Sequence, residues 1–209
     1  MKRLFSSTAV LALAFAAVAL PARAQETPKT VEMQEPQQDE KEMRAEAVKG
    51  QAMASAAVRA EIVRQIGDAE KKLVSLAEAM PADKFAWRPA QGVRSAGEVF
   101  AHVSSANYFL PTLWGGKMPA GVDPRGFEKE GGDKAKAIAT LKSSFANVRQ
   151  AIDALSDADL DRTVKIFDHD GTVREVVMIV ATHAHEHLGQ SIAYARSNGV
   201  TPPWSVKGE

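Results

Sequence analysis

The sequence predicts an all-α protein, a four-helix bundle that follows a signal peptide and a disordered N-terminal tether. Two observations lead to this prediction. Apolar residues recur every three or four positions in four separate stretches, which is the spacing of one face of an α-helix. No stretch alternates apolar and polar residues for long enough to predict a sheet. About 185 of the 209 residues remain after the predicted signal peptide, which is the size of one domain with a single core.

The first 24 residues have the pattern of a secretory signal peptide. Two basic residues, Lys2 and Arg3, precede an apolar, alanine-rich run over residues 4–20, and an Ala-x-Ala pattern ends at Ala24. This arrangement predicts cleavage after Ala24 and export of the mature chain to the periplasm or the medium. The alternative is an uncleaved anchor, for which the apolar run is short. No later stretch predicts a membrane span.

Composition excludes several classes of protein. The chain has no cysteine, so disulfides, thiolate metal ligands and a cysteine nucleophile are excluded, and any metal must be bound by nitrogen and oxygen. The chain has 26 basic and 26 acidic residues, and loss of the signal peptide removes three of the basic ones, which leaves a net charge of −3. This charge does not predict binding to nucleic acid or to an anionic membrane surface.

Residues 25–50 are rich in Gln, Glu, Pro and Lys, which predicts a flexible linker with too little apolar surface to fold. A helical extension from Lys41 onward is the alternative. The domain is predicted to span residues 51–209, and its first helix covers residues 51–80 and stops at Pro81. The positions expected to face the core in this helix are Met53, Ala56, Ala60, Val63, Ile66, Leu73, Leu76 and Met80.

Sequence signals also mark the ends of the other three helices. Ser95 opens a capping-box pattern, Ser-x-x-Glu, and Pro111 is expected to end the second helix. The third helix covers residues 133–155, where apolar residues again have helical spacing. Thr172 opens a second capping-box pattern, and an Asn-Gly pair that ends at Gly199 supplies a left-handed stop to the fourth helix.

Two connecting segments have unusual composition. Residues 111–132 are rich in glycine and proline, and a loop of this length either covers a site or only spans the end of the bundle. Residues 164–171 predict a short extended piece with a turn, and His169 on that turn is expected to be solvated.

Three of the five histidines lie close together in the predicted fourth helix. Because residues four apart share a face of a helix, His183 and His187 can point the same way and bind one divalent ion. His185 should face elsewhere. His102 is the natural third ligand, because it lies in the second helix on a flank that faces the core. The alternative is that the histidines lie on the surface or are bonded to carbonyl groups in the core.

Three imidazole ligands would leave one coordination position of the ion open, as in catalytic zinc sites. Zinc fits this ligand set, and nickel, iron and copper also bind imidazole. Glu186 is a candidate ligand or a group that orients an imidazole, with a solvated flank position as the alternative. Gln190 is a candidate to bind a water or a substrate at the metal, with a position at a helix seam as the alternative.

Four pieces of the sequence, taken in their order along the chain, are typical of one protein family. They are residues 85–95 (FAWRPAQGVRS), 98–103 (EVFAHV), 183–190 (HAHEHLGQ) and the tail 196–203. Together they resemble the DinB-like superfamily, which includes thiol-dependent transferases of the bacillithiol and mycothiol type. The resemblance implies a four-helix bundle with a three-histidine metal site and frequent homodimers. The ligands in this sequence would be His102, His183 and His187.

Three functions are consistent with these observations. The first is an exported metal-dependent enzyme, a hydrolase or a thiol S-transferase, which activates water or a thiol against a small-molecule substrate. Gln190 and Glu186 would have orienting roles. The second is a periplasmic protein that binds a metal or a small ligand without turnover. The third is an interaction protein with a vestigial site, which predicts no stoichiometric metal.

Overall fold

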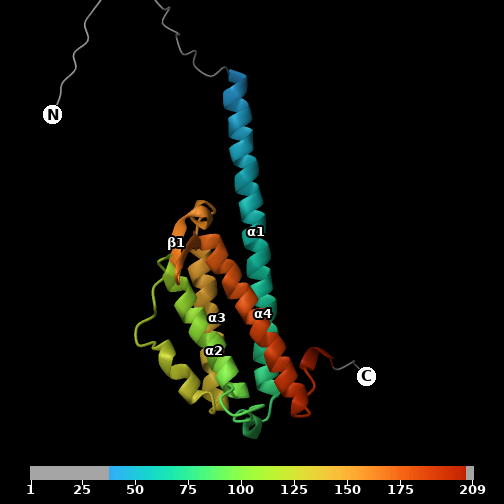
Figure 1. Ribbon diagram of the computed structural model, residues 1–209. Coiled ribbons are helices and arrows are strands. Elements are labelled where there is room, and N and C mark those ends of the chain that lie inside the picture. Colours follow the sequence, from blue (N-terminus) through green and yellow to red (C-terminus); the bar gives the residue numbers. More distant parts are fainter. Residues whose placement is uncertain (1–37, 206–209) are drawn as a thin grey trace, which may run out of the picture.

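The computed structural model describes residues 38–205, so the predicted signal peptide and the first part of the linker lie outside the described residues. Four long helices make up most of the structure (Figure 1). The first and the second helix each pack against the third and the fourth. This four-helix arrangement confirms the predicted fold class. The helices are α1 (Gln38–Ala79), α2 (Ala96–Phe109), α3 (Lys134–Asp153) and α4 (Val173–Ser197).

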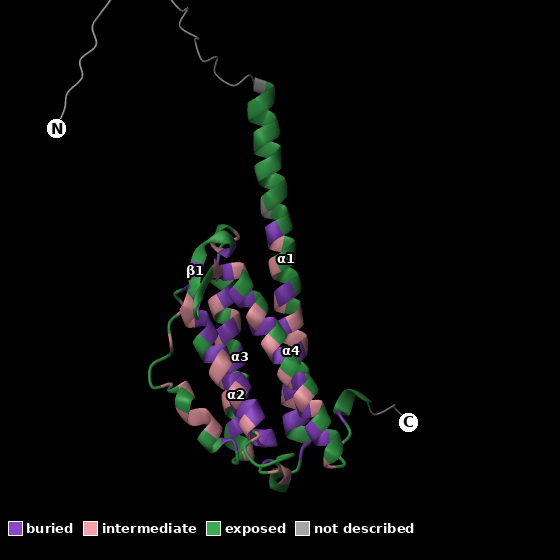
Figure 2. Ribbon diagram, viewed as in Figure 1, coloured by how far each residue is buried: buried purple, intermediate pink, exposed green. Residues whose placement is uncertain are grey.

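Helix α1 begins earlier than predicted. It is continuous from Gln38, which corrects the second half of the linker predicted for residues 25–50. Residues 39–51 are all exposed, and this end of α1 stands clear of the bundle in Figure 2. The composition explains the helix, because residues 38–50 contain many good helix formers and no proline. Ser55 is the first buried residue of the described part of α1, so packing against the bundle begins close to the predicted boundary.

The predicted capping box is complete at the start of α2, and at the start of α4 the structure has the bond made by the Thr172 side chain. The Ser95 hydroxyl accepts a hydrogen bond from the Glu98 backbone N–H at 3.3 Å, and the Glu98 carboxylate accepts one from the Ser95 N–H at 2.6 Å. Thr172 caps α4 by accepting a hydrogen bond from the backbone N–H of Glu175 at 3.3 Å. These bonds satisfy amides that the helix itself leaves free, and they set where each site-bearing helix begins.

The segment predicted to be extended forms a short antiparallel hairpin. Strand β1 (Thr163–Ile166) pairs with β2 (His169–Thr172), and Phe167 and Asp168 form the turn between them. Phe167 has φ +51°, and no other described residue except glycine has a positive φ. The hairpin leads directly into α4.

Residues 111–132 contain two short 3₁₀ helices, η2 (Leu110–Trp114) and η3 (Pro124–Glu130). Helix η3 packs along α2, so the segment covers the side of the bundle that carries His102. The close approach depends on two glycines. A Cβ atom on Gly97 of α2 would lie 1.8 Å from the carbonyl oxygen of Gly131, which follows η3.

We expect Gly97→Ala to lower the free energy of unfolding by about 1–3 kcal/mol, because the added methyl group must push residue 131 away from α2. The matched control is Gly67→Ala in α1, where a Cβ atom would meet nothing within 4 Å. That substitution should stabilise the protein by about 0.5–1 kcal/mol through helix propensity. Urea unfolding of the two variants measures both effects, and an equal response of the two variants would contradict this role of Gly97.

The core lies between the four helices, and its largest fully buried side chains include Phe85, Phe100 and Phe145. Phe100 is on α2 and Phe145 is on α3, and the Phe100 ring packs against Phe85 with the ring centres 5.8 Å apart. Among the described helices, none combines the length and the apolar character needed to cross a membrane.

Candidate metal site

Three histidines from two helices converge in the bundle. His102 comes from α2, and His183 and His187 come from adjacent turns of α4. One potential ligand atom from each lies within 4.8 Å of the other two. The Nε2 atoms of His102 and His183 are 3.2 Å apart, and the ring centres of His183 and His187 are 4.4 Å apart. None of the three side chains is exposed.

Packing between α2 and α4 brings these histidines together. Val99 and Val103 of α2 are fully buried, as are Val180 and Ala184 of α4. His102 lies between the two valines in sequence, on the border of this apolar seam. The seam therefore sets the distance across which the imidazoles face one another.

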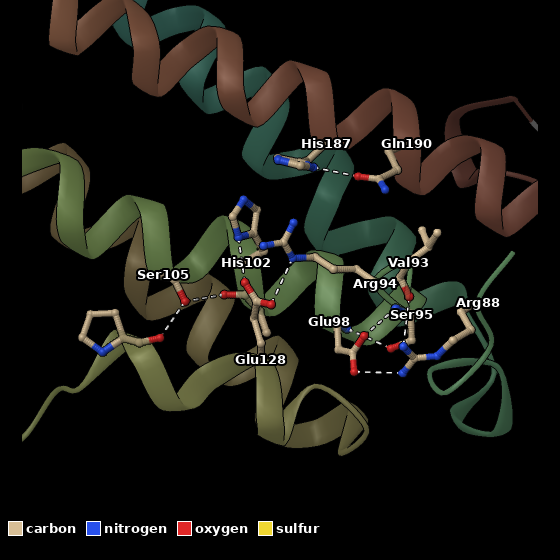
Figure 3. A network of polar contacts seen from close by, with 12 residues as sticks. Arg88, Val93, Arg94, Ser95, Glu98, His102, Ser105, Glu128, His187 and Gln190 are labelled. Atoms are coloured by element: carbon tan, nitrogen blue, oxygen red, sulfur yellow. Dashed lines mark hydrogen bonds and ion pairs between the residues drawn. The ribbon is translucent and has the colours of Figure 1, made fainter. Parts of the chain in front are cut away.

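Side chains outside the cluster orient two of the imidazoles. Glu128 reaches from η3 and accepts a hydrogen bond from His102 Nδ1 at 2.8 Å, while its other oxygen accepts one from Arg94 Nε at 3.0 Å (Figure 3). On α4, the Gln190 amide oxygen accepts a hydrogen bond from His187 Nδ1 at 2.8 Å. A carboxylate or amide oxygen on one ring nitrogen holds the proton there and leaves the other nitrogen free to bind a metal.

The cluster fits a divalent cation. With its proton on Nδ1, His102 presents an unprotonated Nε2 to the Nε2 of His183 at 3.2 Å. Two nitrogens that bind one zinc ion at about 2.0–2.1 Å in a tetrahedral arrangement lie roughly 3.3–3.4 Å apart. The separation is therefore close to the value expected for two ligands of one ion, and hydrogen bonds of the kind made by Glu128 and Gln190 are typical around metal-binding histidines.

The surroundings of His102 and His183 favour the neutral form of these two imidazoles. The pKa of His183 is lowered to about 4, mainly by burial and in smaller part by the neighbouring His187 and His102. Burial also lowers the pKa of His102 despite the opposing hydrogen bond to Glu128. Burial opposes ionisation of Glu128, but hydrogen bonds from Arg94 and His102 outweigh it and lower its pKa. A neutral imidazole is the form that binds a metal.

A cleft of about 1120 Å³ leads to the cluster. His102 and His183 line it, together with residues of η3 and of the preceding loop. Phe167 of the hairpin turn and Phe109 at the end of α2 stand at its sides, with ring centres 6.2 Å apart. The cleft therefore gives a small molecule access to two of the three imidazoles.

Comparison with known proteins places this fold and site in a family. The model of the DinB superfamily matches residues 65–191, a range that covers all three histidines. The chain belongs to the DinB superfamily. This confirms the resemblance to the family, and the sequence pieces over residues 85–103 and 183–190 lie inside the matched range.

Two solved DinB-like proteins have similar structures. One from Bacillus cereus is 16% identical, has a TM-score of 0.61, and the match covers 70% of this chain and 95% of that protein. One from Bacillus subtilis is 20% identical, has a TM-score of 0.53, and the match covers 68% of this chain and 93% of that protein. At these identities the likeness establishes the DinB-like fold alone. The search of curated proteins found no match.

The structure of this DinB-superfamily protein separates the predicted site residues. Gln190 accepts a hydrogen bond from His187, and its amide nitrogen donates one to the Tyr194 hydroxyl at 3.0 Å. Glu186 is exposed and makes no hydrogen bond or ion pair with the described residues, so the structure does not bring it into the cluster. His185 faces α1, as expected, where its Nε2 donates a hydrogen bond to the Gln65 carbonyl at 3.1 Å.

Sequence reasoning missed Glu128 and Arg94. Glu128 lies 26 residues after His102 in the Gly- and Pro-rich segment, and no local pattern marks it. The one usable signal was the composition of residues 111–132, which left open whether the segment covers a site. In the structure this segment covers the histidine cluster, since η3 brings Glu128 into contact with His102.

We expect the metal-free protein to lose stability as the pH falls from about 6.5 to about 4. In that window the unfolded chain protonates His183, whereas the folded chain keeps it neutral because its pKa is about 4. The unfolded state therefore binds more protons, and the free energy of unfolding falls with the pH. Urea unfolding of the metal-free protein between pH 4 and 7 measures the slope, which should be shallower in His183→Leu. Equal slopes would contradict the assignment.

Proposed function

We propose that this protein is a metal-dependent enzyme of the hydrolase or thiol S-transferase type. His102, His183 and His187 would hold one divalent cation, for which zinc is the first candidate and nickel or iron the alternatives. The observation that carries the proposal is the cleft, because two of the three imidazoles line it. A small molecule in the cleft can thus reach a coordination position that three protein ligands leave open.

The protein's own residues have distinct roles in this proposal. A divalent cation with an open position acidifies and polarises a bound ligand such as water or a thiol. Glu128 and Gln190 hold the proton on the outer nitrogen of His102 and His187 and fix the orientation of each ring. Arg94 in turn holds Glu128 in place through its second oxygen. The apolar sides of the cleft would exclude water from a bound substrate.

One observation favours a second candidate, a protein that binds a metal or small ligand without turnover. Both carboxylates that line the cleft are held by arginines: Glu128 by Arg94 at 3.0 Å, and Asp123 by Arg125 at 2.9 Å. Neither is an uncommitted general base. An enzyme would then need the metal to generate the nucleophile without help from a free carboxylate.

Metal analysis combined with turnover assays tests the proposal. Protein purified without added metal, and protein reloaded with zinc after chelation, would be assayed with a p-nitrophenyl ester alone and with an aryl chloride plus cysteine. The enzyme proposal predicts one metal ion per chain and turnover that disappears with chelation, returns with metal and is lost in His187→Ala. Stoichiometric metal without turnover of any substrate class would support the binding protein. Unchanged metal content and turnover in His187→Ala would contradict both.

Export and assembly remain predictions from the sequence. We propose that the protein is exported and cleaved after Ala24, on the strength of the basic, apolar and Ala-x-Ala pattern of the first 24 residues. N-terminal sequencing of the protein from the periplasmic fraction should read Gln25 first. A cytosolic protein that retains its first residues would contradict this. The homodimer implied by the family resemblance can be tested by sedimentation equilibrium.

A further inference from the structure

We infer that the site takes an amphipathic small molecule, with an apolar body lying in the cleft and one polar head directed at the histidine cluster. This inference rests on the proposed function, since the head would occupy the open position of the metal. It goes further by naming the class of ligand. Its support comes from the cleft walls, the hairpin turn and the positions of the polar groups.

Most of the surface that lines the cleft is apolar, although the charged residues Asp123, Arg125 and Lys129 of η3 and the loop before it also line it. At about 1120 Å³ the cleft is larger than a metal-binding head group needs and has room for a drug-sized body. Aromatic and aliphatic side chains from α2, the following loop, the hairpin and α4 supply most of its surface. These side chains are Phe109, Leu110, Met118, Val122, Phe167 and Ile179.

Two phenyl rings at the mouth are left exposed to solvent. Phe109 is 42% exposed and Phe167 is 65% exposed, although their rings stack at 25° to each other with centres 6.2 Å apart. Large apolar side chains that remain exposed beside a concave site often mark a binding surface. An apolar ligand in the cleft would cover both rings.

The backbone of Phe167 gives the same indication. Its φ of +51° is uncommon for a bulky residue, and a two-residue hairpin turn of this kind favours glycine at its first position. Phenylalanine here costs stability, and the ring packs on Phe109 instead of in the core. Strained positions of this sort concentrate at functional sites.

Most polar groups of the cleft outside its inner end are already bonded, and the exception is Lys129, which is exposed and lines the cleft without a hydrogen bond or ion pair to the described residues. The Ser105 hydroxyl donates hydrogen bonds to the carbonyl groups of Ala101 and Pro124, at 3.1 Å and 2.8 Å. The two carboxylates of the cleft are paired with arginines, as described above. A ligand therefore finds apolar surface along its middle and imidazoles at its inner end, which is the pattern an amphipathic molecule would match.

Hydroxamates of different chain length test this inference on the cobalt-loaded protein. Visible spectra would report binding of acetohydroxamate and of octanohydroxamate, which share a metal-binding head and differ by six methylene groups. Each methylene that is fully buried contributes about fourfold in affinity. We expect octanohydroxamate to bind at least about 30-fold more tightly, because the cleft is open and buries the chain in part. Equal affinities would overturn the inference.

Replacing Phe167 at the hairpin turn by glycine tests whether its ring contributes to binding of the apolar chain. Phe167→Gly removes the ring and suits the positive φ, so the fold and the cobalt spectrum should be kept. We expect it to weaken octanohydroxamate by at least about fivefold and to leave acetohydroxamate unchanged. Trp204→Gly is the control, because Trp204 is 40% exposed and does not line the cleft. An octanohydroxamate affinity that Phe167→Gly leaves unchanged would overturn the inference.

Calorimetry on the metal-free protein separates this inference from the proposed function. Without metal, octanohydroxamate should still bind weakly and lose affinity in Phe167→Gly, whereas acetohydroxamate should not bind. If cobalt does not bind to the histidines but this metal-free pattern is seen, the proposed function fails and the apolar cleft stands. If cobalt binds and both hydroxamates have the same affinity, the ligand class fails and the metal site stands.

Discussion

His102→Ala is expected to abolish stoichiometric metal binding, with an affinity loss of at least about a hundredfold. The substitution removes one of three ligands, and the 10–16 kcal/mol typical of a four-ligand zinc site suggests roughly 3 kcal/mol for each ligand. His102 lies 81 residues before His183, yet the Nε2 atoms of the two are 3.2 Å apart. Competition with a coloured zinc chelator measures the affinity of wild type and variant.

His185→Ala is the control for that experiment. His185 belongs to the same stretch of α4 as His183 and His187, but its ring is bonded to the Gln65 carbonyl of α1 and does not reach the cluster. This variant should keep the wild-type metal affinity and lose only some stability. A metal that survives in His102→Ala and is lost in His185→Ala would show that the ligand set is wrong.

Glu128→Gln is expected to lower the metal affinity by about tenfold, and Glu128→Ala by up to about a hundredfold. The glutamine keeps an acceptor oxygen for His102 but loses the negative charge that Arg94 and His102 share. The alanine leaves the Nδ1 proton of His102 without its acceptor, so the ring is free to turn. The same chelator competition measures both variants.

Glu130→Gln serves as the control on the same 3₁₀ helix. Glu130 forms an exposed ion pair with Lys136 at 2.6 Å and does not line the cleft, so its loss should leave the metal affinity unchanged. Equal affinities of wild type and Glu128→Ala would mean that η3 does not influence the metal. A drop common to the Glu128 and Glu130 variants would instead indicate a general effect of charge.

Local signals in the sequence were sufficient for most of the fold. The caps at Ser95 and Thr172 and the stop at Gly199 depend on interactions within a few residues, so their sequence patterns predict them directly. The first helix shows the limit of such reasoning. Met53 has the helical spacing of a core residue, yet it is 66% exposed, and the residue that is buried at this end of α1 is Ser55, which accepts a hydrogen bond from Arg174 of α4 at 3.5 Å. Spacing predicts a face of a helix and does not predict whether a partner covers it.

The site was predictable only in part, for a similar reason. His183 and His187 share a face because of helix geometry, and His102 was found through its position on a core-facing flank. Glu128 could not be found in this way, since its contact depends on the path of residues 111–132 and on the approach of Gly131 to Gly97. Glu186 is exposed, as in the alternative of a solvated flank position, because its sequence position beside His187 does not decide which way its side chain faces.

Residues 122–130, which include η3, contact both the histidine cluster and the cleft. Glu128 contacts a metal-ligand candidate, and neighbouring residues of the same segment, Val122 and Pro124, line the cleft. A ligand that contacts Val122 and Pro124 in the cleft would also affect the position of Glu128, which orients His102. The segment is therefore the place where occupancy of the cleft and the properties of the metal site would influence each other.

Binding of one cation by the three histidines is tested most directly by an anomalous difference map at the zinc absorption edge, measured from crystals of the zinc-loaded protein. We predict a single strong peak in each chain, about 2.0–2.1 Å from one nitrogen of each of His102, His183 and His187. A map with no peak between these residues, or a zinc ion bound elsewhere without His102, would show that these three histidines do not form the metal site.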